Sequence, residues 1–312
     1  MAHTVAELGE FGLIDAMVAG QPPTKGIEVG PGDDAAVLAL GGGRTVATTD
    51  LLVETHHFRR DWSSAEDVGH KASAQNLADL VAMAARPVAV LVGLGLPADL
   101  PVDWVQELYR GLRAECDPLG VGVAGGDVVA AEQVTVAVTA LGELLGDAPL
   151  RRGGARAGDV VAVYGRLGWA EAGLAVLRRG FRSPRVLVDA HRRPAVPYDA
   201  GDSALEHGAT AMCDVSDGLL ADAGHIATAS GVAIDVHTDQ LYVPDPMSEI
   251  ASALGVDPVR WVLHGGEDHA MVATFPTPPA HPWRVVGTVA SGSGVTVDGE
   301  AYEHTSGHTH FG

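Results

Sequence analysis

Cysteine is almost absent from this chain. Cys116 and Cys213 are its only two cysteines, and each stands in an apolar segment with no second cysteine near it. The sequence therefore offers neither a disulfide framework nor a set of thiolate metal ligands, and we expect a reducing, cytoplasmic environment. Long apolar runs are absent too, because charged residues and a proline interrupt the most apolar region, residues 77–96. With no basic leader at the start, the sequence predicts neither a signal peptide nor a membrane-spanning helix.

Positive charge is scarce as well, at 20 Lys and Arg against 40 Asp and Glu, for a formal net charge of -20. Such a charge repels a polyphosphate backbone over most of the surface and argues against a nucleic-acid partner. Several common motifs are missing: the GxxxxGK[ST] loop, the GxSxG elbow, HExxH and CxxC. Their absence excludes a standard phosphate loop and the commonest serine hydrolase, zinc protease and thiol redox chemistry.

The length and the apolar content indicate two domains, since 312 residues with 46% hydrophobic residues can bury two cores. In the first half the expected elements follow an α+β order, with helices at about 8–17, 63–85 and 103–115 and strands at 35–38, 45–49, 88–96, 121–124 and 134–141. Ser63 followed by Glu66 is a capping-box pattern that predicts the start of the second helix. The three glycines at 41–43 predict a hairpin turn.

A polar, glycine-rich stretch at residues 146–158 lacks periodicity and predicts the link between the domains. We place the boundary there, giving domains of residues 1–148 and 149–312. Beyond it, the strands expected at 160–164 and 209–215 each lead into a helix, at 170–179 and 219–229. This alternation predicts an α/β second domain.

Aspartates recur beside glycine directly after strand-like or apolar segments, in GDD (32–34), TTD (48–50), GGD (125–127), DVSD (214–217) and GGED (265–268). Glycine allows a sharp turn and a close backbone approach to a ligand, and a carboxylate at a strand end points into the cleft where such folds bind ligands. Magnesium prefers hard oxygen ligands, with one or two carboxylates for each ion and substrate phosphates completing the shell. Any one of these segments reads equally well as an ordinary turn, but the set favours several magnesium ions.

Asp79 is the most informative single residue, because it stands in the apolar run 77–81 of an expected helix. A buried carboxylate without a partner costs several kcal/mol, so we expect a cation or a metal beside it. The alternative is that Asp79 faces solvent or caps a neighbouring loop. Helical spacing places Asn76 on the same face as Asp79.

Taken in order, these motifs resemble the thiamine-monophosphate kinase family, in the superfamily that includes aminoimidazole ribonucleotide synthetase. The resemblance spans nearly the whole chain, through GEF (9–11), GDDAA, TTDLLVETHHF, HKASAQNLADLVAMAARP, AGGD, LRRGGARAGD, CDVSDGL and HGGEDH. It implies a two-domain PurM-like fold: an N-terminal α+β domain whose strands form a β-barrel across a homodimer, and a C-terminal α/β domain. It also implies an ATP site near the dimer interface.

The same resemblance implies roles for particular residues. Those implied as magnesium ligands are Asp34, Thr48, Thr49, Asp50, Asp79, Asp127, Asp214 and Asp217, of which Asp50, Asp79 and Asp127 are the expected catalytic groups. Those implied to contact ATP are Tyr109, Gly126, Asp127, Arg152 and Ser216, and those implied to contact thiamine monophosphate are His57, Glu267 and His308. Without the resemblance, His57 and Arg152 read equally well as loop and linker residues.

Two departures from the family pattern concern the substrate pocket. His269 and Ala270 follow GGED where GGEDYE is usual, and His308 stands where an aromatic residue is common. The reaction implied is transfer of the ATP γ-phosphoryl group to thiamine monophosphate, with several Mg²⁺ ions. The alternatives are another ATP enzyme of the superfamily, such as an amidine-forming ligase or a selenophosphate-forming enzyme, and a catalytically silent nucleotide- or metal-binding protein.

Overall fold

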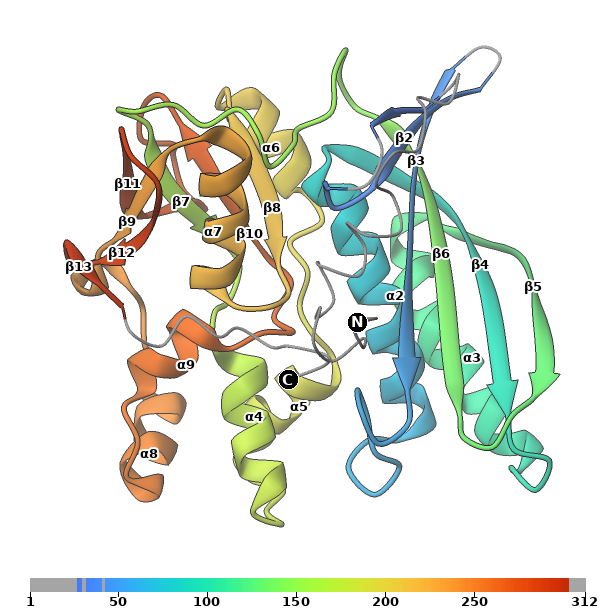
Figure 1. Ribbon diagram of the computed structural model, residues 1–312. Coiled ribbons are helices and arrows are strands. Elements are labelled where there is room, and N and C mark those ends of the chain that lie inside the picture. Colours follow the sequence, from blue (N-terminus) through green and yellow to red (C-terminus); the bar gives the residue numbers. More distant parts are fainter. Residues whose placement is uncertain (1–26, 30–31, 41–42, 303–312) are drawn as a thin grey trace, which may run out of the picture.

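The computed structural model describes residues 27–29, 32–40 and 43–302, and these form two sheets flanked by helices (Figure 1). The expected helix near the start of the chain and the expected substrate residue His308 lie outside the described residues. No described helix is long and apolar enough to cross a membrane. The connection between the last strand of the first sheet and the first strand of the second contains the predicted boundary at 148/149.

The first sheet has six strands in the order β1-β2-β3-β6-β4-β5. Its elements are β1 (Ile27–Val29), β2 (Ala36–Leu40), β3 (Gly43–Val53), α2 (Ala65–Ala82), β4 (Ala85–Leu96), α3 (Val102–Cys116), the 3-10 turn η1 (Asp117–Leu119), β5 (Gly122–Ala130) and β6 (Thr135–Leu144). The β2–β3 pair is antiparallel, so the predicted hairpin is confirmed. Among these described strands, only β4 and β5 pair in parallel. β5 is the last strand in the order and forms one edge of the open sheet.

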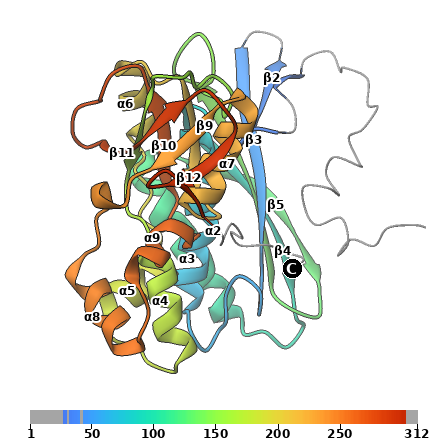
Figure 2. The same ribbon diagram turned by 60° about the vertical axis from the view of Figure 1, so that its left-hand side comes forward.

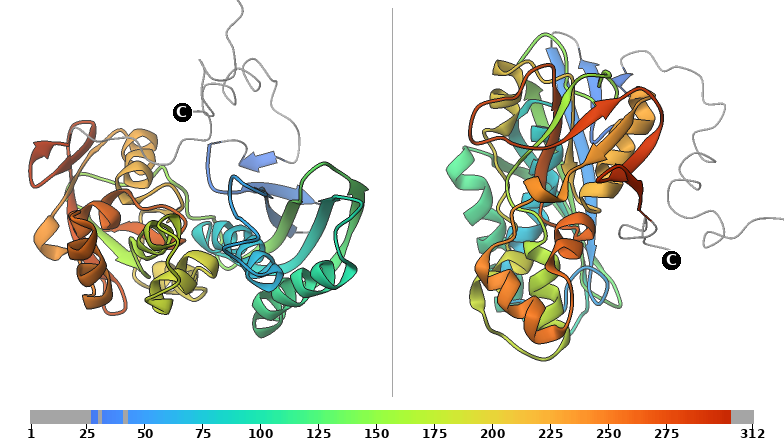
Figure 3. Two further views of the ribbon diagram at one scale, coloured as in Figure 1. Left: turned by 90° about the horizontal axis from the view of Figure 1, so that it is seen from below. Right: turned by 90° about the vertical axis from the view of Figure 1, so that its left-hand side faces the viewer.

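Helix α2 is buried on almost every side because it lies between the two sheets (Figure 3, left). One side packs against the first sheet through Leu77 and Leu80, and another packs against strands of the second sheet through Ala74 and Ala78. Helix α2 also packs closely against α3, and a small residue allows this approach: a Cβ on Gly69 would lie 2.0 Å from the carbonyl oxygen of Leu108 on α3. The helix therefore carries its polar residues into the junction between the domains.

The start of α2 differs from the predicted capping box by one residue. The cap is Ser64, whose hydroxyl accepts from the backbone N–H of Asp67 at 3.2 Å while the Asp67 carboxylate accepts from the backbone of Ser64 at 2.9 Å. The predicted pair, Ser63 and Glu66, was wrong: each of the two adjacent serines has an acidic residue three positions further on, and the reciprocal hydrogen bonds form at Ser64 and Asp67.

The second sheet has seven strands in the order β13-β12-β9-β11-β7-β10-β8. Its elements are β7 (Val160–Tyr164), α4 (Trp169–Arg178), α5 (Arg185–Arg192), α6 (Ala200–Glu206), β8 (Ala211–Val215), α7 (Leu219–Ser230), β9 (Ala233–Val236), the 3-10 turn η2 (Thr238–Gln240), α8 (Asp245–Leu254), α9 (Pro258–His264), β10 (Ala270–Phe275), β11 (Arg284–Ala290), β12 (Gly294–Val297) and β13 (Glu300–Ala301). Helices α4, α5, α8 and α9 gather at one end of this sheet (Figure 2).

The second domain, which was expected to be α/β from its strand-helix alternation, has a sheet whose strands pair mostly antiparallel. β7 and β8 do each lead toward a helix, but β10 lies between them and pairs antiparallel with both. Among the described strands of this sheet, only β12 and β9 pair in parallel. Local strand-helix alternation does not specify which strands become neighbours or their relative direction, so a later strand can lie between two earlier ones.

Candidate active site

The predicted aspartates from β3 and α2 meet where the helix crosses the strand. Thr48 and Asp50 alternate with Thr49 along β3, so both side chains point to the face on which α2 packs. The Thr48 hydroxyl donates to Asp79 Oδ2 at 2.7 Å, and the Asp50 backbone N–H donates to Asn76 Oδ1 at 2.9 Å. The prediction that Asn76 and Asp79 lie on one face of this helix is confirmed.

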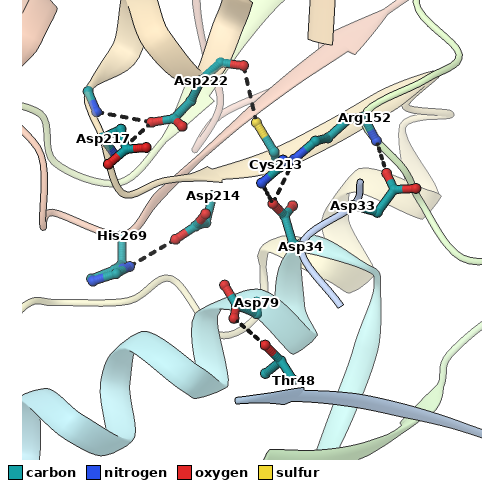
Figure 4. Close-up of polar contacts among 11 residues, drawn as sticks. Asp33, Asp34, Thr48, Asp79, Arg152, Cys213, Asp214, Asp217, Asp222 and His269 are labelled. Carbon is teal, nitrogen blue, oxygen red and sulfur yellow. Dashed lines mark hydrogen bonds and ion pairs between the residues drawn. The ribbon is translucent and has the colours of Figure 1, made fainter. Parts of the chain in front are cut away.

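Two further aspartates join this group from other parts of the chain (Figure 4). Asp34, just before β2, accepts from Arg152 Nε at 3.0 Å, while its Oδ2 is buried and has no hydrogen-bond partner among the described residues. Asp214, near the end of β8, lies 2.9 Å from His269 Nδ1 through its own Oδ2. The departure from the family pattern at His269 therefore lies beside a predicted metal ligand.

The carboxylates of this group repel one another. Burial raises the pKa of Asp79 well above its ordinary value, and Asp50 and Asp214 add to the effect. Burial raises the pKa of Asp34 to about 7, although Arg152 opposes the shift. The uncompensated negative charge and the buried, unpaired oxygen of Asp34 make this group suited to hard divalent cations such as Mg²⁺.

A second acidic group forms at the start of α7. Ligand atoms of Asp217, Asp222 and His225 all lie within 4.8 Å of one another. Asp222 Oδ2 accepts from the backbone N–H of Asp217 at 3.1 Å and of Gly218 at 3.0 Å, and burial raises the pKa of Asp222 well above its ordinary value. The sequence reading included Asp217 but missed Asp222, whose signal is an acidic residue in the first turn of a helix after a glycine.

Four predicted residues lie away from this group in the single chain. Asp127 and Gly126 are on the edge strand β5, which β4 and β6 separate from β3. Asp127 pairs with Gly93, Gly93 with Ala137, and Ala137 with Leu51. This register places the Asp127 side chain on the face of the sheet opposite to Asp50, and Thr49 shares that opposite face. Tyr109 is 46% exposed on α3.

A cavity of about 710 Å³ opens between the two domains. His269 links it to the carboxylates, because His269 lies 2.9 Å from Asp214 and interacts electrostatically with Glu267 in the cavity wall. One wall is the loop after β3, including His57, Phe58 and Trp62, and the other comes from α4, α5, α9 and the GGED segment. Two predicted substrate residues, His57 and Glu267, line this single cavity. The loop of Ser216 adjoins it, because the Ser216 carbonyl accepts from the Glu267 backbone N–H at 2.8 Å.

Glu267 is held by basic groups from both domains. Its Oε1 lies 2.8 Å from Lys71 Nζ on α2, and its Oε2 lies 3.4 Å from His191 Nδ1 on α5. Burial alone would raise the pKa of Glu267, but the Lys71 ammonium outweighs burial and holds this pKa at about 2. Burial and Lys71 lower the pKa of His191 to about 3, so the His191 ring is neutral near pH 7. Lys71 Nζ also donates to the His57 carbonyl at 3.4 Å. The sequence reading missed Lys71, whose signal is a lysine on an otherwise buried helix.

Comparisons with known proteins identify the family of this chain. Residues 32–144 match the family model "AIR synthase related protein, N-terminal domain", and residues 156–299 match "AIR synthase related protein, C-terminal domain". The thiamine-monophosphate kinase of Mycobacterium tuberculosis is 48% identical over 99% of this chain and 93% of its own length. That of Aquifex aeolicus is 35% identical over 98% of this chain and 99% of its own length.

Solved structures give the same result. The structure of AaThiL complexed with AMPPCP and TMP is 34% identical, covers 99% of both chains and has a TM-score of 0.91. The structure of thiamine monophosphate kinase from Aquifex aeolicus is 33% identical, covers 96% of this chain and 100% of the other, and has a TM-score of 0.86. Structures of the hydrogenase maturation protein HypE share the fold at 16 to 22% identity. On these grounds, this chain belongs to the thiamine-monophosphate kinase family.

Proposed function

We propose that this protein transfers the γ-phosphoryl group of ATP to thiamine monophosphate, giving thiamine diphosphate and ADP. The observation that carries this proposal is a carboxylate group, formed by Asp34, Asp50, Asp79 and Asp214, which His269 links to the Glu267 wall of a cavity of about 710 Å³. A relative whose structure contains AMPPCP and TMP matches this chain over 99% of its length. A nucleotide with its metal ions suits the carboxylate group, and a small organic phosphate suits the adjoining cavity.

In this proposal the residues divide into three groups. Magnesium is held by Asp34, Thr48, Thr49, Asp50, Asp79, Asp127, Asp214 and Asp217; ATP contacts Tyr109, Gly126, Asp127, Arg152 and Ser216; and thiamine monophosphate contacts His57, Glu267 and His308. Bound Mg²⁺ ions neutralise the charge of the two phosphate chains and stabilise the charge that develops during transfer. Arg152 forms an ion pair with Asp34, so one residue proposed to contact ATP lies directly beside one proposed to hold the metal.

The attacking atom is a phosphate oxygen of thiamine monophosphate, which is already ionised near neutral pH. No side chain has to remove a proton from it, so the site needs no general base. The work of the protein is therefore to hold two polyanions in line and to exclude water. Lys71 serves this purpose by fixing Glu267 and the His57 carbonyl, which come from different domains, to one point.

We also propose that the protein is a cytoplasmic homodimer in which the first sheets of two protomers form a β-barrel, with the domain boundary at 148/149. Two features support an interface at β5. It is an edge strand, and its Val128 and Val129 are 63% and 56% exposed. Edge strands with exposed apolar residues are sites where another chain adds to a sheet.

The direct test is an assay of thiamine diphosphate formation from ATP and thiamine monophosphate, with and without Mg²⁺. We expect product and ADP in equal amounts only when the metal is present. ATP hydrolysis or product formation only with an amidine precursor or selenide would favour another enzyme of the superfamily. Calorimetric binding of ATP with no turnover of any acceptor would favour a silent binding protein.

Glu267→Gln is expected to raise the KM for thiamine monophosphate by about tenfold or more while leaving the KM for ATP near its original value. The change removes a charge-assisted acceptor in the cavity and leaves Lys71, which is 3% exposed, without its ion pair. Initial rates at varied concentrations of each substrate measure both constants, and a melting curve identifies any general loss of folding. An unchanged KM for thiamine monophosphate would exclude Glu267 from the substrate site.

A further inference from the structure

Glu171 is a second carboxylate in the wall of the cavity, and the proposed reaction gives it no role. It lies in the first turn of α4, which runs beside α9 (Figure 1), and its side chain is partly buried. Among the described residues it has no hydrogen bond and no ion pair within 4 Å. The cation that acts on it most is Arg178, an exposed residue two helical turns further along α4.

The two carboxylates of this wall differ in how their charge is balanced. Glu267 has the Lys71 ammonium 2.8 Å from its Oε1, so its negative charge is already compensated inside the protein. Glu171 lacks a comparable partner among the described residues. Burial raises the pKa of Glu171, Arg178 opposes this shift, and the nearby charge of Glu267 raises the pKa further. A cation bound in the cavity would therefore stabilise the charged form of Glu171 more than that of Glu267.

The backbone holds Glu171 firmly against the GGED segment. The Asp268 carboxylate accepts from the backbone N–H of Ala170 at 2.8 Å and also from that of Gly168, which ties the start of α4 to this segment. A Cβ on Gly265 would lie 2.9 Å from the Cβ of Glu171. Glu171 and Glu267 are thus fixed on one wall, and the position of Glu171 does not depend on a mobile loop.

Three arginines, Arg59, Arg178 and Arg260, line the cavity together with Glu171. Arg59 is paired with Asp61 at 2.9 Å and lies 4.5 Å from the ring centroid of Trp62. Trp62 and Trp261 also line the cavity. Thiamine monophosphate carries a permanently charged thiazolium ring in addition to its phosphate group, so its two ends require opposite charges in the site. Aromatic surfaces with one uncompensated carboxylate match such a ring.

We propose that Glu171 determines specificity for the cationic thiazolium ring of the substrate, which rests on the proposed kinase function. The carboxylate attracts the ring charge directly, while Glu267 serves as a fixed hydrogen-bond acceptor. Because both substrate and product carry the ring, Glu171 acts on binding and not on the phosphoryl transfer itself. Its removal raises KM and leaves kcat nearly unchanged.

The test compares two acceptors in four proteins. The acceptors are thiamine monophosphate and the monophosphate of an analogue in which a neutral thiophene ring replaces the thiazolium. The proteins are the wild type, Glu171→Gln, Glu171→Asp and Glu249→Gln; Glu249 is an exposed carboxylate on α8 outside the cavity lining and controls for loss of one negative charge. Initial rates give kcat and KM, and calorimetry gives Kd without turnover.

We expect the wild type and Glu249→Gln to prefer the charged acceptor by about tenfold in Kd and KM. Glu171→Gln should lose this preference, with weaker binding of the charged acceptor and unchanged binding of the neutral one, while Glu171→Asp should keep part of it. Equal weakening of both acceptors in Glu171→Gln, or a preference that survives the substitution, would overturn the proposal. A wild type that converts neither acceptor would instead refute the kinase function, a different outcome from a lost preference.

Discussion

Asp79→Asn is expected to lower turnover by about a thousandfold or more while making the metal-free protein more stable. The Asp79 carboxylate faces the charges of Asp50, Asp214 and Asp34, which together with burial raise its pKa well above the ordinary value. Asparagine keeps an acceptor for the Thr48 hydroxyl and removes the charge. The substitution therefore reduces the repulsion among the carboxylates when no Mg²⁺ is bound, and it also removes one proposed metal ligand.

The two effects are measured separately. Differential scanning fluorimetry without Mg²⁺ should show a melting temperature several degrees higher for Asp79→Asn, as expected for a gain of about 1–3 kcal/mol. Added Mg²⁺ should raise the melting temperature of the wild type and change that of the variant little. Asp99→Asn, which removes an exposed carboxylate from the same domain, is the matched control and should resemble the wild type in both assays. Turnover of Asp79→Asn within tenfold of the wild type would refute the assignment.

The carboxylate group was predictable because each member carries a local signal. Asp79 interrupts an apolar helical run, and Asn76 follows the same helical face, so a polar face inside a buried helix could be read from spacing alone. Asp50 ends a β-branched segment and alternates with Thr48. We inferred that these segments lie close together because buried carboxylates need a cation to balance their charge, and one group of metal ions can serve several of them.

The cavity could not be predicted in the same way. Its walls come from the loop after β3 and from α4, α5 and α9, and their meeting depends on how the domains pack around α2. No periodicity in the sequence encodes a contact between Lys71 and Glu267, which lie far apart in the chain. The insertion of β10 between β7 and β8 likewise depends on long-range pairing, which local propensity does not specify.

Asp127 is the proposed metal ligand that lies farthest from the other proposed ligands of its own chain. Sequence motifs placed it with the other metal ligands, yet its side chain is exposed on β5, with two strands between it and β3. Across three strand spacings this separation is about 14 Å, and the side chain points to the opposite face from Asp50. If Asp127 is a ligand, as we propose, the simplest geometry is that it serves the site of the partner protomer.

This geometry predicts that two inactive variants restore activity when combined. Asp127→Ala and Asp50→Ala homodimers should each turn over at least about a hundredfold more slowly than the wild type, because each lacks a ligand in both sites. A heterodimer of the two has one site with both residues intact and one site lacking both. Co-expression with two different tags and tandem purification isolates this heterodimer, and its rate should be about half that of the wild type.

The outcome separates the possible locations of Asp127. A ligand acting within its own chain leaves both sites of the heterodimer damaged, so its rate would stay near those of the parents. An Asp127→Ala homodimer as active as the wild type would remove Asp127 from the site altogether. Asp79→Ala combined with Asp50→Ala is the matched control: both residues lie in one group within a single chain, so this heterodimer should gain nothing. Recovery confined to the pair that includes Asp127 would place β5 of one protomer at the active site of the other.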